Sequence, residues 1–198
     1  MDDATPALNR PAPQTLDLLL SRRSGSAKAM TGPGPNTEQL RTILSAAARV
    51  PDHGKLAPWR FIVFEGEARE RMGDLLVEAL LRNEPDANAQ RQEIERGRFL
   101  RAPVIVGVVS CVKEGIPIPV WEQELSSGAS CFAMLLAAHA MGFVGNWITE
   151  WYAFDRFVAA GLGLADNERI AGFVYLGTSA VPLEERVRPD LDTLISRF

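Results

Sequence analysis

The stretch that decides the fold is "LSSGASCFAMLLAAHAMGFVGNWIT", residues 125–149. It contains no Lys, Arg, Asp or Glu and is long enough to cross a bilayer. However, serines, His139 and Asn146 interrupt it, and glutamates flank both ends, which is unusual for a membrane span. Small residues mixed with large apolar ones suit a helix inside a globular protein. We therefore predict no membrane span but a long core helix over residues 119–141, ended by Gly142.

The chain around this helix shows helical and strand patterns without internal repeats. Continuous β-branched runs predict buried strands, and apolar residues at helical spacing predict amphipathic helices. Asn36 and Gln39 have the spacing of a capping box, which marks a helix start. Predicted helices lie over 15–23, 37–50, 67–81 and, as a solvated helix, 87–100; predicted strands lie over 60–66, 103–112 and 170–178. We therefore predict an α+β layered fold whose small mixed or antiparallel sheet has four or five strands and is flanked by helices.

Composition limits the domain organisation and the partners. A chain of 198 residues fits one domain, which we place at 15–198 after a flexible leader over 1–14 that lacks the apolar core of a signal peptide. The tail has little periodicity and is expected to form a C-terminal arm. The formal net charge is −4, with no basic stripe to neutralise nucleic-acid phosphates. Cys111 and Cys131 lie in apolar stretches and are expected to be reduced thiols, which favours a cytoplasmic protein.

Several common nucleotide-binding, catalytic and metal-binding motifs are absent from the sequence. There is no P-loop and no nucleophile elbow, and "GLGLAD", residues 161–166, lacks the third glycine of a Rossmann motif. His53, His139 and the two cysteines show no ligand-like spacing in the sequence, so no metal site is expected. A core helix this long in a small domain suggests that part of its surface is buried against a second copy.

Two cationic segments are candidates for a binding site. Arg22, Arg23 and Ser24 offer guanidinium and hydroxyl donors of the kind that a phosphate needs, although plain surface charge is the alternative. Residues 49–59, "RVPDHGKLAPW", place a compact set of cationic donors on one loop. Pro, Asp and Gly in the same loop also explain much of it as a structural turn.

An uncharged segment is the third candidate. Residues 142–151, "GFVGNWITEW", contain glycines that allow a backbone to approach a flat ligand closely. Trp147 could pack beside such a ligand. The alternative is a helix end followed by ordinary core residues.

In this order, the segments resemble the nitroreductase family of flavoproteins, and most closely its small members. The family pattern has R-R-S near the N-terminus, a loop that ends in Q-P-W, a W-E-Q-E-like helix start, a long apolar helix and a G-F-x-x-x-W turn. The matching stretches here are "RRS" at 22–24, "VPDHGKLAPW", "WEQELSSGAS" and "GFVGNWIT". The similarity spans about Leu16 to Gly177. Ala57 and Lys55 depart from the family pattern.

The resemblance implies a nitroreductase-like fold and a homodimer with FMN at each of two subunit interfaces, around a long buried interface helix. A backbone N–H near Thr149 is implied as the donor to flavin N5. Arg186 and Arg188 could supply further cations for the phosphate. The FMN ligands that the resemblance implies are Arg22, Arg23, Ser24, Trp147, Ile148 and Thr149 from one subunit, and Arg49 and His53 from the other.

The implied activity is that of an FMN-dependent NAD(P)H oxidoreductase. NAD(P)H would act as a transient hydride donor, and nitro compounds, quinones or similar small molecules would be the acceptors in ping-pong turnover. No catalytic side chain is implied, because the flavin carries the hydride chemistry. Two alternatives are a flavin-binding or flavin-modifying protein without nitroreductase turnover, and a structural or interaction dimer.

Overall fold

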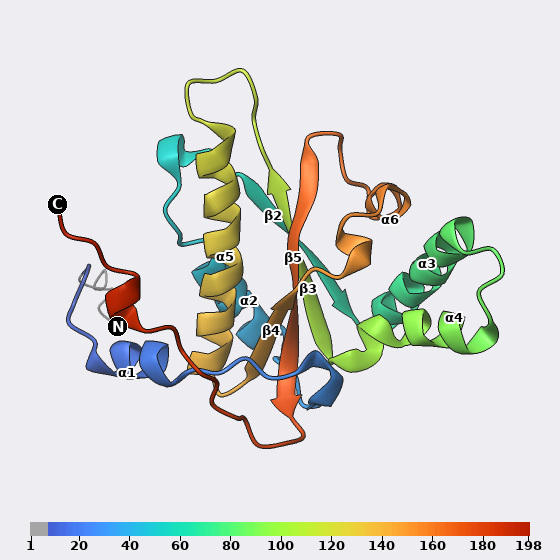
Figure 1. Cartoon of the computed structure of the whole chain (residues 1–198), viewed down its shortest axis with the longest axis horizontal. Helices are drawn as coiled ribbons and strands as arrows, with labels where there is room; N and C mark the ends of the chain where they lie inside the picture. Colours follow the sequence, from blue (N-terminus) through green and yellow to red (C-terminus); the bar gives the residue numbers. More distant parts are fainter. Residues whose placement is uncertain (1–7) are drawn as a thin grey trace.

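The structure is a computed structural model that describes residues 8–198 (Figure 1). In this part of the chain a five-stranded sheet has the order β1-β5-β3-β2, β4 also pairs with β5, and every pairing is antiparallel. The strands are β1 (Met30–Thr31), β2 (Trp59–Glu65), β3 (Val104–Cys111), β4 (Val144–Ile148) and β5 (Glu168–Ser179). The helices are α1 (Pro13–Ser21), α2 (Thr37–Ala47), α3 (Ala68–Asn83), α4 (Ala89–Arg96), α5 (Val120–Ala140) and α6 (Arg156–Gly161). The predicted α+β class is confirmed.

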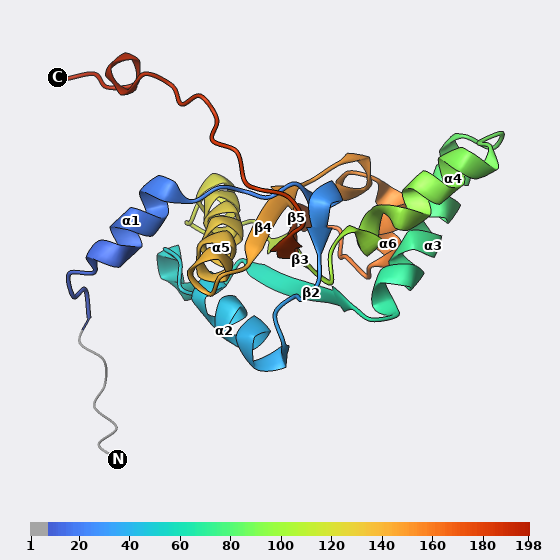
Figure 2. The same cartoon turned by 90° about the horizontal axis from the view of Figure 1, so that it is seen from below.

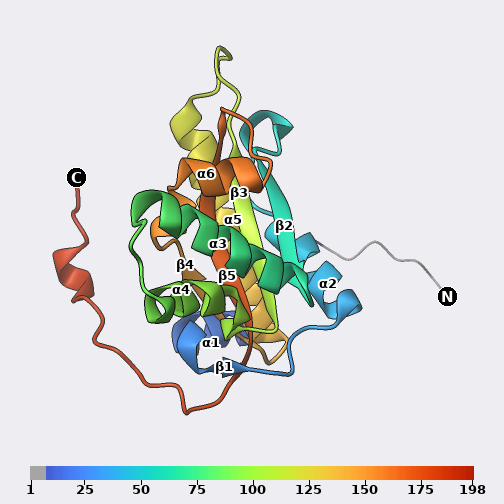
Figure 3. The same cartoon turned by 90° about the vertical axis from the view of Figure 1, so that its right-hand side faces the viewer.

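Two hydrophobic cores lie on opposite faces of the sheet, because successive side chains of a strand point in opposite directions. In β3, Val106 and Val108 pack with residues of α2 and α5, whereas Ile105 packs with residues of α3. Figure 2 shows α2 and α5 on one side of the sheet, and Figure 3 shows α3, α4 and α6 in front of the other. β3 is therefore covered on both faces, as its β-branched sequence predicted.

The long helix predicted around residues 119–141 is α5. Pro119 is its N-cap, and Gly142 follows its end with φ 84, a value that favours glycine. Its buried face includes Cys131, Met134 and Leu135, which pack against the sheet. None of the helices in residues 8–198 is long and apolar enough to cross a membrane.

The opposite face of α5 leaves large apolar side chains in solvent. Trp121 is 66% exposed, Leu125 53% and Phe132 41%. Their spacing places them on one side of the helix. We call these three residues the apolar stripe of α5. Within one chain, α5 is thus buried on the sheet side only.

The start of α2 confirms the predicted capping box. The backbone N–H of Gln39 donates to Asn36 Oδ1, and the backbone N–H of Asn36 donates to Gln39 Oε1, both at 2.9 Å. Two amides at the start of the helix thereby find acceptors, which fixes where α2 begins.

Two elements differ from the sequence-based prediction. Residues 144–148, which we expected in a turn, form β4 and pair with β5 from Val144–Gly177 to Ile148–Phe173. The helix predicted over 87–100 ends at Arg96 and is not simply solvated, because Glu95 and Phe99 are fully buried. In both cases the deciding partners are distant in sequence, and local propensity does not report them.

Both described chain ends lie on the α5 side of the molecule (Figures 1 and 2). Helix α1 has no buried residue and begins at Pro13, two positions before the domain start predicted from sequence. The first seven residues of the predicted leader lie outside the described residues. After β5 the chain runs as an exposed tail with one short helical turn, Leu191–Thr193.

Glu168 in β5 is expected to make the fold sensitive to acid. Arg60 donates to its carboxylate through Nε and Nη2, both at 2.7 Å, and chiefly for this reason the pKa of Glu168 is lowered to about 2. A carboxylate whose pKa is lowered on folding stabilises the fold at pH values above its unfolded pKa of 4.5. This contribution is lost as the pH falls from 4.5 to about 2. In urea titrations, the stability gap between wild type and Glu168→Gln should therefore narrow over that range.

The control for this prediction is Glu67→Gln. Glu67 pairs with Arg71, and both side chains are highly exposed, so its removal should change stability little at any pH. If Glu168→Gln lowered stability by the same amount from pH 7 to pH 2, the ion pair would not be the cause.

Candidate functional site

The R-R-S segment, residues 22–24, lies against the C-terminal end of α5. Arg22 Nη2 donates to Ser24 Oγ at 2.9 Å, and Arg22 Nε lies 3.3 Å from Nδ1 of His139 in the last turn of α5. The other ring nitrogen of His139 accepts the backbone N–H of Gly145 at 3.2 Å. Burial, the largest cause, lowers the pKa of His139 to about 4, so the ring is neutral and can accept a hydrogen bond at one nitrogen only. Nη1 of Arg22 donates to no acceptor within residues 8–198 and is therefore left available to a ligand.

Arg22 has no carboxylate partner among residues 8–198. Arg23, in contrast, donates through Nε to the carbonyl of Glu184 at 2.9 Å and lies 3.4 Å from the carboxylate of Glu185. Partial burial, followed by the positive charges of Arg188 and Arg23, lowers the pKa of Arg22. A bound anion would relieve this repulsion and accept hydrogen bonds from the guanidinium groups.

Strand β4 lies directly beside the R-R-S segment. Asn146 Nδ2 donates to the carbonyl of Gly25 at 2.5 Å, which ties β4 to the residue that follows Ser24. The side chain of Ile148 packs into the core on the α3 side, so this residue offers backbone rather than side chain to a ligand. The backbone N–H of Thr149 is not the donor of any hydrogen bond within the described part of the chain. The first and third predicted segments are thus brought together.

The indole of Trp147 lies in a slot between two glycines. Its Nε1 donates to the carbonyl of Ala171 at 3.1 Å. A Cβ added to Gly172 of β5 would lie 1.8 Å from this Nε1, whereas one added to Gly128 of α5 would lie 3.7 Å from the ring. The side chain is still 39% exposed, so part of the ring is packed and part is open to solvent.

Gly172→Ala is expected to displace the indole of Trp147. The added methyl overlaps Nε1, so the ring must leave the slot or the strand must shift, at a cost of about 1–3 kcal/mol. A red-shifted tryptophan emission and a lower unfolding midpoint in urea would report this. Gly128→Ala is the matched control, because its methyl makes an ordinary contact and alanine favours a helix by about 1 kcal/mol. Equal destabilisation by both variants would contradict the tight packing of Trp147 against Gly172.

Arg49 and His53 lie at the opposite end of α5. His53 Nδ1 is 2.7 Å from Oε2 of Glu122, in the first turn of α5, and Arg49 is exposed after α2. Between Glu122 and His139 the helix rises by about 25 Å, at about 1.5 Å per residue. Within one chain, the structure therefore does not bring these two residues to the R-R-S segment.

The loop that carries His53 is held by an aspartate. The carboxylate of Asp52 accepts the backbone N–H groups of Leu56, at 3.0 Å, and Ala57, at 2.9 Å. Lys55 and Ala57, the two departures from the family pattern, have φ values of 55 and 46, which favour glycine. Asp52 thus stabilises an otherwise unfavourable backbone and gives His53 a fixed support.

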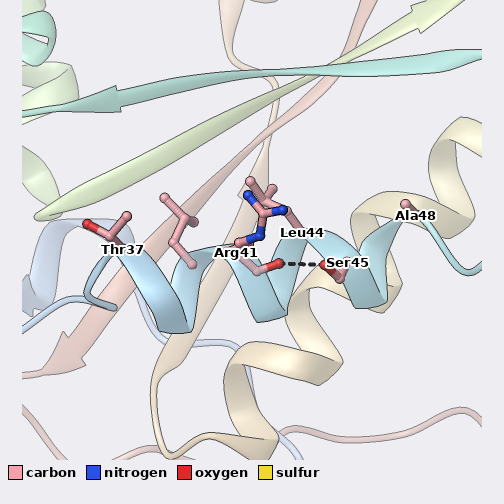
Figure 4. A pocket seen from close by; sticks show the side chains of 6 residues that line it. Thr37, Arg41, Leu44, Ser45 and Ala48 are labelled. Atoms are coloured by element: carbon pink, nitrogen blue, oxygen red, sulfur yellow. Dashed lines mark hydrogen bonds between the residues drawn. The ribbon is translucent and has the colours of Figure 1, made fainter.

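Two hollows lie on the surface near these elements. A cavity of about 310 Å³ opens beside Trp147, between α5 and the start of β5, with Glu124 and Arg169 in its wall. Figure 4 shows another, over α2, where Ser45 Oγ donates to the carbonyl of Arg41 at 2.8 Å. All residues that line this second hollow belong to α2 or its C-cap, and none is a predicted ligand, so we assign it no role.

Sequence reasoning missed the contacts that support the predicted ligands. The contact of Arg22 with His139 joins residues that lie far apart in the chain, and nothing near either one signals it. A glycine inside a helix, as at Gly128, does carry a signal, because it costs about 1 kcal/mol relative to alanine and often marks close packing. Across residues 8–198 there is no group of three His, Cys, Asp or Glu side chains suited to a metal.

Comparisons with known proteins agree with one another. The model of the nitroreductase family matches residues 19–178. A protein of Escherichia coli (strain K12), "Putative NAD(P)H nitroreductase YdjA", is 38% identical over 186 residues, which cover 92% of this chain and 98% of the relative. A Haemophilus influenzae protein, "Putative NAD(P)H nitroreductase", is 36% identical over 174 residues, which cover 87% of this chain and 92% of the relative.

Solved structures share the fold. The crystal structure of a nitroreductase-like family protein from Bacillus cereus has a TM-score of 0.81 at 21% identity, over 97% of this chain and 99% of that one. A nitroreductase with bound FMN from Bacteroides fragilis has a TM-score of 0.65 at 21% identity, over 89% and 95%. At these identities the likeness concerns the fold, and it confirms the predicted nitroreductase-like architecture.

Proposed function

The chain belongs to the nitroreductase family, and on that premise we propose that it is an FMN-dependent NAD(P)H oxidoreductase. One arrangement supports the proposal. Arg22 is a cation without a carboxylate partner in residues 8–198, and Thr149 has an unused backbone N–H. The two residues lie on segments that the Asn146–Gly25 hydrogen bond joins. A flat ligand with a phosphate tail needs an anion site and a backbone donor within reach of each other. Nitro compounds, quinones and similar electrophiles are the proposed acceptors.

We propose that the functional unit is a homodimer in which α5 packs antiparallel to α5 of a second copy. A two-fold axis across the middle of the helix brings the His139 end of one copy to the Glu122 end of the other. Arg49 and His53 of one subunit would then approach Arg22 of its partner. This geometry supports the expectation that each FMN takes ligands from both subunits.

Exposed apolar surface supports the same dimer. The apolar stripe of α5 would be covered by the second copy, as would parts of α1, where Leu16 and Leu20 are exposed. The exposed tail carries Leu191 and Leu194, both 65% exposed, and would act as an arm over the partner. Large apolar side chains gathered on one side of a small protein commonly mark an interface.

The proposed roles follow from the chemistry of each group. FMN would supply the hydride acceptor, so the chain needs to provide position, charge and access. Arg22, Arg23 and Ser24 would hold the phosphate, and Thr149 would direct its N–H toward flavin N5. Trp147 and the backbone of Ile148 would flank the ring, and Arg49 and His53 of the partner subunit would complete the site. NAD(P)H would donate hydride and leave before the acceptor enters, so no dedicated Rossmann motif is needed.

An anaerobic stopped-flow titration of the FMN-loaded protein tests this function. NADH or NADPH should bleach the flavin absorption near about 450 nm, and a quinone or nitro compound should restore it. A protein that takes up no FMN would refute the proposal. A yellow protein that neither nucleotide bleaches would favour the flavin-binding alternative.

We also propose that the protein is cytoplasmic. Cys111 and Cys131 are both free, and burial raises the pKa of each thiol to about 12, so neither forms a reactive thiolate at neutral pH. Free, unreactive thiols are typical of proteins from reducing compartments. Fractionation of the native host would test the location.

A further inference from the structure

A buried carboxylate anchors a network at the end of α4. Glu95 is fully buried, and it accepts from Arg98 Nη2 and from Trp151 Nε1, both at 2.7 Å; Arg91 also pairs with it. Burial, the largest effect, raises the pKa of Glu95, but the hydrogen bonds from Arg98, Trp151 and Arg91 outweigh it and lower the pKa. Glu95 is therefore an ionised group that fixes the position of Arg98.

Arg98 and Arg101 converge on Glu150, the residue that follows Thr149. Arg98 pairs with one carboxylate oxygen of Glu150, and Arg101 Nη1 lies 2.7 Å from the other. The side chains of Arg98 and Arg101 are only 16% and 14% exposed, so water competes little for these bonds. Two poorly solvated guanidinium groups on one carboxylate form a clamp with little freedom to move.

The clamped residue has a strained backbone. Glu150 has φ 52 and ψ 179, a combination that glycine adopts readily and other residues avoid. Neither its own backbone N–H nor that of Thr149 donates to an acceptor within residues 8–198. The strained position thus lies next to two unused donors, and strain of this kind persists only where surrounding contacts enforce it.

We propose that Glu150 is a positioning residue for the flavin site. The clamp by Arg98 and Arg101 holds the peptide groups on either side of Thr149 in the orientation in which their N–H groups face the flavin edge. Trp151, anchored on Glu95, prevents the turn from rotating as a unit. This inference rests on the proposed function and explains why a glutamate occupies a backbone position that suits glycine.

Glu150→Gly tests the clamp, because it removes the carboxylate while glycine tolerates φ 52 without strain. In the FMN-free protein, hydrogen–deuterium exchange over residues 147–151 should rise by about tenfold or more, with no change in β3. In the FMN-loaded protein, hydride transfer from NADH should slow by about tenfold or more, because small misplacements are costly. FMN affinity should change by less than about threefold, because the phosphate ligands are untouched.

Two further variants sharpen the test. Asp74→Asn breaks the exposed pair with Arg96 between α3 and α4 and should change neither exchange nor hydride transfer. Glu150→Gln keeps the side-chain shape and one acceptor oxygen, so it should give values between wild type and Glu150→Gly.

The outcomes separate three possibilities. Unchanged exchange in Glu150→Gly would show that the clamp does not hold the turn. Faster exchange with wild-type hydride transfer would reduce Glu150 to a structural role and overturn the positioning proposal. A wild-type chain that takes up no FMN would instead refute the proposed function itself, whatever the exchange data show.

Discussion

Arg22→Ala is expected to weaken FMN binding by about 10- to 100-fold. Among residues 8–198, Arg22 has an Nη1 group that donates to no acceptor and has no carboxylate partner, and its pKa is already lowered by burial and by Arg188 and Arg23. Hydrogen bonds to a charged group contribute about 1.5–3 kcal/mol, which corresponds to this range of affinity. Fluorescence titration of the apo-protein with FMN measures the effect directly.

Riboflavin provides the decisive comparison, because it has the same ring and side chain but no phosphate. If Arg22 holds the phosphate, Arg22→Ala should weaken FMN binding and leave riboflavin affinity within about twofold. Arg41→Ala, which removes an exposed arginine of α2, should affect neither ligand. Equal weakening for FMN and riboflavin would show that Arg22 supports the fold of the site rather than the phosphate.

Local signals in the sequence predicted much of the fold. The capping box at Asn36 and the β-branched run of β3 are read within a few residues, and both are confirmed. β4 was missed because Gly145 and Asn146 are poor strand formers, and its hydrogen bonds come from β5, more than twenty residues later. The burial of Glu95 was missed for the same reason, since Trp151 and the arginines decide it through tertiary contacts.

In the candidate site, too, local sequence signals identified some residues, whereas long-range contacts decide the positions of others. Sequence order alone selected Arg22 and Trp147, and the structure brings their segments together through Asn146. It does not bring His53 to them in one chain, because α5 separates the two ends of the site. The strained φ of Glu150 has no sequence signature, since it depends on two arginines about fifty positions earlier.

The two ends of the site should prove to come from different subunits. Consider a heterodimer of one chain with Arg22→Ala and one with Arg49→Ala and His53→Ala, purified through two different tags. If each site takes Arg22 from one subunit and Arg49 and His53 from the other, one of the two sites carries every substitution and the other is wild type. This heterodimer should bind about one FMN with wild-type affinity, although neither parent homodimer does.

The reciprocal heterodimer supplies the control. Here one chain carries all three substitutions and its partner is wild type, so in a shared arrangement both sites are damaged and no FMN binds with wild-type affinity. Sites contained within single chains would reverse the two results, with one intact site here and none in the first heterodimer. The separation of His53 from Arg22 along α5, about 25 Å at about 1.5 Å per residue, is the physical reason to expect the shared arrangement.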